Sequence, residues 1–117
     1  MLLEAAKHIR NEIVVAFDPK LIPVGIPWCR EEDYDAFVAI FEDANELPLT
    51  RKEFIEPYEQ VEKDFQVKGQ AVKRVYIDPR TFPNWCAKEG RRVNTKARKR
   101  FAAEIAIKEY RSAGGSW

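Results

Sequence analysis

Apolar side chains recur at helical spacing between positions 30 and 44. They follow one another at i, i+3, i+4 and i+7, which predicts a helix with one buried stripe. The residues of this stripe are Tyr34, Phe37, Val38 and Phe41. The outer face of the predicted helix is acidic and carries Glu31, Glu32, Asp33, Asp35, Glu42 and Asp43.

A second long helix is predicted after a break at 45–48. Thr50 and Glu53 have the spacing of a capping box, so this helix is expected to begin at Thr50 and to end at Gly69. Pro57 removes one main-chain hydrogen bond, and its ring collides with the main-chain carbonyl one turn earlier. A kink there or a restart of the helix at Glu56 is therefore expected. The predicted buried face consists of Phe54, Tyr58, Val61 and Phe65.

Short runs rich in β-branched residues predict the strands. Residues 71–77 form the clearest one, and the apolar run 13–17 is its expected partner in the sheet. Residues 2–11 have the pattern of a short amphipathic helix. Three prolines between positions 19 and 27 predict an extended covering loop over 21–28.

The last third of the chain has the pattern of two helices. Asp78-Pro79 predicts the start of a short helix that ends at Gly90, and Asn94 is the expected cap of a last helix over 95–112. The predicted fold class is therefore α+β. We expect a mainly helical single domain over residues 1–112, with a minor two-stranded sheet, a C-terminal helix-turn-helix-like pair and a flexible tail over 113–117.

One pattern occurs twice. Phe17-Asp18-Pro19 and Ile77-Asp78-Pro79 each follow a predicted strand and are each followed by Trp-Cys, at Trp28-Cys29 and Trp85-Cys86. Convergent turn chemistry is the favoured interpretation, because the spacing differs between the two copies. The alternative is a half-repeat with its two strands side by side.

The two cysteines, Cys29 and Cys86, each follow a tryptophan, which is typical of small buried positions in a reducing compartment. With a single histidine, His8, the chain has too few ligands for a structural zinc site, and no cysteine-protease signature surrounds either thiol.

No motif indicates an enzyme. The chain has no G-x-S-x-G, no P-loop and no G-x-G-x-x-G, and its carboxylates between 33 and 46 lack the loop that binds calcium. We therefore predict no catalytic, cofactor-binding or metal-ligating residue, and no cofactor.

The overall charge is balanced, with 20 Lys and Arg against 19 Asp and Glu and a formal net charge of +1. The two signs are nevertheless separated along the chain. Residues 1–66 hold 7 basic and 15 acidic residues, a net of −8, whereas residues 67–117 hold 13 and 4, a net of +9. The candidate binding surface is the basic segment 88–100, with Lys88, Arg91, Arg92, Lys96, Arg98, Lys99 and Arg100.

A basic segment of this kind is typical of phosphate binding. The predicted pair of helices around it, joined by a turn of about four residues, has the size of a helix-turn-helix. In a second interpretation the acidic segment 31–46, or a neighbouring copy of the chain, covers the basic segment. The sequence leaves both interpretations open.

Residues 34–104 resemble a pattern of small bacterial proteins without assigned chemistry. The matching positions are Tyr34-Asp35-Ala36-Phe37, Leu47-Pro48, Val72–Ile77, Asp78-Pro79, Phe82, Trp85-Cys86, Gly90, Ala97-Arg98 and Phe101-Ala102. The resemblance implies an intracellular bacterial accessory protein and transfers no active-site residue.

The leading hypothesis for function is a non-catalytic interaction module that binds a partner protein or another copy of itself. A small nucleic-acid-binding regulator that uses the basic segment is the alternative, and a small enzyme is third. The longest unbroken apolar run, 13–17, is too short to span a bilayer, and the first residues lack the charge of a secretory signal. We expect a cytoplasmic protein with no membrane partner.

Overall fold

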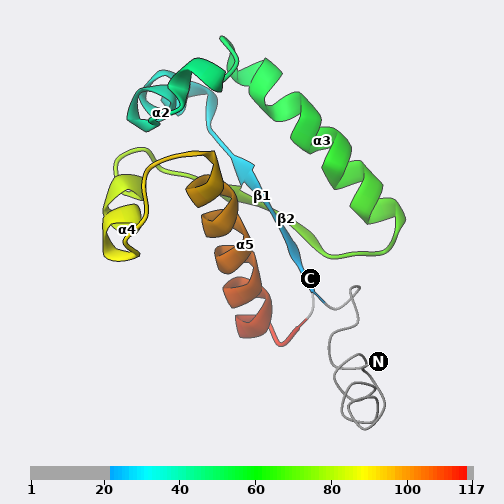
Figure 1. The fold of residues 1–117 in the computed structure, drawn as a ribbon. Helices are drawn as coiled ribbons and strands as arrows, with labels where there is room; N and C mark the ends of the chain where they lie inside the picture. The colour runs from blue at the N-terminus through cyan, green and yellow to red at the C-terminus, as the bar shows by residue number, and fades with distance from the viewer. Residues whose placement is uncertain (1–21, 116–117) are drawn as a thin grey trace, which may run out of the picture.

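The computed structural model describes residues 22–115. Its elements follow in the order β1 (Val24–Trp28), the 3-10 helix η2 (Glu31–Asp33), α2 (Tyr34–Ile40), the 3-10 helix η3 (Ala44–Glu46), α3 (Arg51–Val67), β2 (Val72–Tyr76), α4 (Phe82–Lys88) and α5 (Thr95–Ser112). The two strands are parallel and lie between α3 on one face and α5 on the other (Figure 1). The α+β fold class and a two-stranded sheet are thereby confirmed, although the described partner of β2 is β1 and not the expected run 13–17. No helix within 22–115 is long and apolar enough to cross a membrane.

The predicted loop over 21–28 is wrong, because most of it is strand β1. In the ladder, Val24 donates to the carbonyl of Ala71 at 2.8 Å and Ile77 donates to the carbonyl of Trp28 at 2.9 Å. Main-chain groups alternate between the two sides of a strand, so those of Pro27 point away from β2. A proline at such an edge position removes no ladder hydrogen bond. The expected strand 13–17 and helix 2–11 lie outside the described residues.

Local capping signals set the ends of the long helices. The hydroxyl of Thr50 accepts a hydrogen bond from the main-chain N–H of Glu53 at 3.2 Å and donates to its carboxylate at 2.9 Å. Helix α3 then runs to Val67 without a restart at Glu56, and Gly69 follows it with a φ of 77°. The side chain of Asn94 accepts from Ala97 at 3.0 Å, and α5 begins at the next residue, as predicted.

The predicted helix over 30–44 is shorter than expected. Phe41 adopts extended backbone angles and ends α2, and the 3-10 turns η2 and η3 flank it. Its apolar stripe is confirmed, because Tyr34, Phe37 and Phe41 are buried and Val38 packs against the core. The rings of Tyr34 and Phe37 contact Phe54 of α3, which ties α2 to the start of α3.

Helix α5 packs closely on β1 through small residues. Ala102 and Ala106 are fully buried and face Gly25, where an added Cβ would lie 2.0 Å from the carbonyl oxygen of Ala102. A glycine in the middle of a strand often marks such an approach of another backbone. Helix α5 can therefore lie this close to β1 only because Gly25 has no side chain.

The two Trp-Cys pairs occupy different structures. Trp28-Cys29 stands at the end of β1, whereas Trp85-Cys86 lies within α4. This difference agrees with the interpretation that the two copies are convergent and not a half-repeat. The first Asp-Pro of the pattern lies outside the described residues. Both thiols are buried and unpaired.

Candidate interaction sites

The basic segment 88–100 does not form one exposed surface, because Arg98 is part of the interior. It is 4 % exposed, and its guanidinium lies 4.7 Å from the ring centre of Phe41 and 5.5 Å from that of Phe54. Helical spacing could have shown this, since Arg98 shares the row i, i+4, i+8 with the buried Ala102 and Ala106. Arg98 is therefore removed from the candidate binding surface.

Two further arginines of the basic segment are engaged in ion pairs. Nε of Arg92 lies 2.8 Å from the carboxylate of Glu42, and Arg100 pairs with Glu104 one turn along α5. Arg91 is half-buried, and its Nε is buried without a hydrogen-bond partner in the described chain. The remaining cations, Lys88, Lys96 and Lys99, are exposed.

The acidic segment covers the start of the basic helix in part. Oδ2 of Asp43 accepts from the main-chain N–H of Thr95 at 3.0 Å and from its hydroxyl at 2.6 Å. Burial works to raise the pKa of Asp43, but these hydrogen bonds and the nearby charge of Arg98 outweigh it and hold the pKa below its usual range. A carboxylate of the chain itself thus occupies the helix end that would otherwise attract a phosphate.

The connection between α4 and α5 is six residues long, from Glu89 to Asn94, and not about four as expected. The two helices meet through aromatic rings, with Trp85 and Phe101 at 5.0 Å between ring centres. The helix-turn-helix-like order is present, and the connection is longer than the 3–4 residues typical of the DNA-binding motif.

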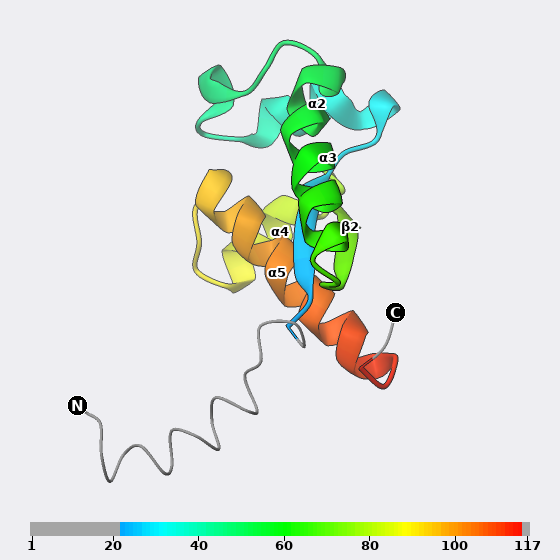
Figure 2. The same cartoon turned by 90° about the vertical axis from the view of Figure 1, so that its right-hand side faces the viewer.

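The outer edge of β2 is a second candidate site, which sequence reasoning missed. Because residues 71, 73, 75 and 77 bond towards β1, the main-chain groups of Val72, Arg74 and Tyr76 point away from it. None of these outward groups has a hydrogen-bond partner within residues 22–115. Figure 2 shows β2 at the margin of the sheet, with no described helix beyond it.

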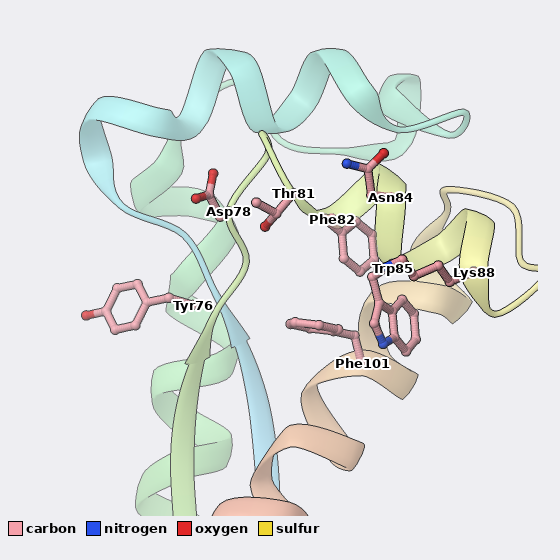
Figure 3. Close-up of a pocket in the computed structure, with 8 residues that line it drawn as sticks. All are labelled: Tyr76, Asp78, Thr81, Phe82, Asn84, Trp85, Lys88 and Phe101. Atoms are coloured by element: carbon pink, nitrogen blue, oxygen red, sulfur yellow. The ribbon is translucent and has the colours of Figure 1, made fainter.

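Two hollows lie beside this edge. The larger, of about 440 Å³, is lined by Phe82, Trp85 and Phe101, with Lys88, Asp78, Asn84, Thr81 and Tyr76 around them (Figure 3). The smaller, of about 240 Å³, is bounded by the β2 residues 73–76 and by Phe101, Ile105 and Glu109 of α5. Tyr76 and Phe101 border both, so the two hollows are neighbours along the edge of β2 and are together called here the edge groove.

Aromatic rings from α4 and α5 form the wall of the edge groove. Phe82 is buried, while Trp85 and Phe101 are half-buried and meet edge to face. In Figure 3 these three rings gather between the two helices, and the ring of Tyr76 points to the other side of the strand. Tyr76 is 50 % exposed there, and the centre of its ring lies 5.4 Å from the guanidinium carbon of Arg30.

The cations of β2 itself are held by the flanking helices. Arg74 forms two hydrogen bonds of 2.9 Å with Glu62 of α3, and its guanidinium lies 4.0 Å from the ring centre of the buried Trp28. Lys73 pairs with Glu109 of α5. The charged side chains of β2 are therefore paired, while its outward main-chain groups have no partner among the described residues.

The described residues offer little nucleophilic or metal chemistry. Burial, with Asp33 nearby, raises the pKa of the Cys29 thiol to about 12, and burial also raises that of Cys86. Within residues 22–115, no three His, Cys, Asp or Glu side chains come together as a metal site.

No protein-family model, curated protein or solved structure matched this chain when each was compared with it. The resemblance to small bacterial proteins therefore stays an expectation.

Proposed function

We propose that this chain is a non-catalytic protein-interaction module, which binds a partner protein or a second copy of itself. The observation that carries the proposal is the outer edge of β2, whose main-chain groups have no hydrogen-bond partner within residues 22–115, beside the edge groove. Unpaired strand edges are ready templates for another chain, and half-exposed aromatic residues are enriched where proteins meet.

The separation of charge supports the same function. Exposed carboxylates surround α2 and the start of α3, whereas Lys88, Lys96 and Lys99, three exposed lysines of α4 and α5, lie in the basic segment. Complementary charge on a partner would increase the association rate and orient the encounter.

Nucleic-acid binding by the basic segment has weaker support. Arg98 is interior, Arg92 and Arg100 are engaged with carboxylates, and Asp43 occupies the start of α5. The cations that remain are few compared with the phosphate contacts of typical duplex-binding proteins.

A cytoplasmic location is part of the proposal. It is supported by the two buried, unpaired thiols, which fit a reducing compartment.

Site-specific photo-crosslinking tests the proposal. A benzoylphenylalanine at position 76 of the full chain, in the cells that produce it, is expected to give discrete protein adducts, because Tyr76 borders the open edge. The same probe at Leu49, which is 94 % exposed in the loop before α3, is the matched control and should give none.

Each outcome of this experiment is decisive. Adducts with a foreign protein or with a second copy at position 76 support an interaction module. Adducts with nucleic acid, or the same adducts at both positions, contradict it, as does a complete absence of adducts.

A further inference from the structure

We infer that β2 accepts an extended segment of a partner protein as a third strand of the sheet, with two apolar side chains and one carboxylate facing α5 and α4. This inference rests on the proposed function and adds the mode of binding and the chemistry of the partner. It concerns a foreign chain, and a second copy of this chain is one of the outcomes that the test distinguishes.

The main chain of β2 defines the hydrogen bonds that such a segment would make. Val72, Arg74 and Tyr76 each present an outward N–H and C=O, spaced two residues apart along the strand. A strand laid about 4.8 Å away would pair with all three residues, as in other cases of strand addition. The ladder to β1 would remain intact, because it uses the intervening residues.

The edge groove defines the side chains of the segment. Every second residue of an added strand would face α5, on the side where Val75 packs against Ala102 and Ala106. Alternate side chains would then enter the hollow beside Ile105 and the hollow beside Trp85, which share Phe101 as a wall. Apolar residues two positions apart fit this arrangement.

The charges around the groove favour an acidic segment. Lys88 lines the larger hollow and forms no salt bridge within residues 22–115, whereas Lys73 and Arg74 already have acidic partners in α5 and α3. One carboxylate on the same face as the apolar residues would therefore complement Lys88.

The charges also disfavour a second copy. Antiparallel pairing of two β2 strands, centred on the outward-bonding Arg74, would place the two Arg74 side chains next to each other. Basic residues on an edge strand oppose pairing between identical chains.

Selection from a displayed library of short random peptides on the full chain tests the inference. Arg74→Pro removes an outward N–H and no bond to β1, while Arg74→Ala removes the contacts with Glu62 and Trp28 and keeps the N–H. We expect enriched peptides with alternating apolar residues and one carboxylate. They should bind Arg74→Ala like the wild type and Arg74→Pro about tenfold more weakly.

Hydrogen exchange gives a readout that does not depend on the folding of a variant. An enriched peptide should slow exchange at the amides of Val72, Arg74 and Tyr76 in the wild-type chain. Lys88→Glu should weaken binding, whereas Lys99→Glu, an exposed lysine away from the groove, is the matched control and should have no effect.

Several results would overturn the inference: no enrichment, enriched peptides that bind Arg74→Pro as well as the wild type, or unchanged exchange at the three amides. A dimer seen by light scattering and abolished by Arg74→Pro would assign the edge to a second copy instead. Slow exchange at the three amides in the monomeric chain without peptide would assign it to this chain's own run 13–17, the partner expected from the sequence. Protein adducts at position 76 without slowed exchange would preserve the interaction function and exclude strand addition.

Discussion

Replacing Gly25 with alanine is expected to destabilise the fold strongly, because the new methyl group would meet α5. The added Cβ would lie 2.0 Å from the carbonyl oxygen of Ala102, 2.6 Å from its carbonyl carbon and 2.9 Å from the Cβ of Ala106. Ordinary contacts of a Cβ begin at 3.4 Å, so α5 would have to retreat by about 1.4 Å. The two nearest obstructing atoms belong to the helix backbone and cannot rotate away.

Overfilling a packed core lowers the free energy of unfolding by about 1–3 kcal/mol. Because Gly25→Ala would displace a helix backbone, we expect a loss near the upper end, at about 3 kcal/mol. Small domains are stable by only about 5–15 kcal/mol. For a domain of this size, about 3 kcal/mol corresponds to a melting temperature lower by about 12–24 °C.

The assay is urea and thermal unfolding followed by tryptophan fluorescence and circular dichroism. Gly69→Ala is the matched control, since nothing lies within 4 Å of its added Cβ and only its φ of 77° opposes alanine. Its cost is expected to be about 1 kcal/mol. Adding Ala106→Gly to Gly25→Ala should restore little, because the clash with the carbonyl of Ala102 remains. A melting temperature of Gly25→Ala within about 4 °C of the wild type would refute the close packing of α5 on β1.

Asp43→Asn is expected to lower stability at neutral pH by about 1–2 kcal/mol, because the start of α5 loses a charged acceptor. Since the folded chain lowers the pKa of Asp43, its contribution is present above the unfolded pKa and disappears as the pH falls through the folded pKa. The melting temperatures of wild type and variant should therefore converge in acid, and a constant difference would argue against this role. Thiol reagents at mildly alkaline pH should label neither Cys29 nor Cys86 in the native chain and both in urea, because both are buried with raised pKa values; rapid native labelling would contradict this burial. In fluorescence anisotropy, duplex DNA should not bind at low salt; salt-sensitive binding lost in Lys96→Gln and Lys99→Gln would instead support the nucleic-acid alternative.

The sequence determined the elements whose signals are local. The capping pairs of α3 and α5, the glycine after α3 and the apolar stripe of α2 involve residues within two turns of one another. Their geometry depends on the nearby backbone, so these features could be predicted without knowing the rest of the chain.

The strand β1 could not be predicted in the same way. Pro27 interrupts a strand if its position needs an N–H for the ladder, and it is tolerated if its main-chain groups point away from the partner strand. Which case holds depends on the partner strand and on the register of the pair. The sequence contains the proline and does not show which side of the strand faces a neighbour.

The candidate sites also combine features that the sequence shows with features that only the tertiary structure shows. The separation of acidic and basic residues is a property of the sequence. Only the tertiary structure decided that Arg98 lies among aromatic rings and that Asp43 covers the start of α5. It also decided that the outer edge of β2, unpaired within residues 22–115, lies beside Trp85 and Phe101. The physical reason is that burial, ion pairing and edge position arise from contacts between segments distant in the chain, whereas helix caps and apolar periodicity arise within a single segment.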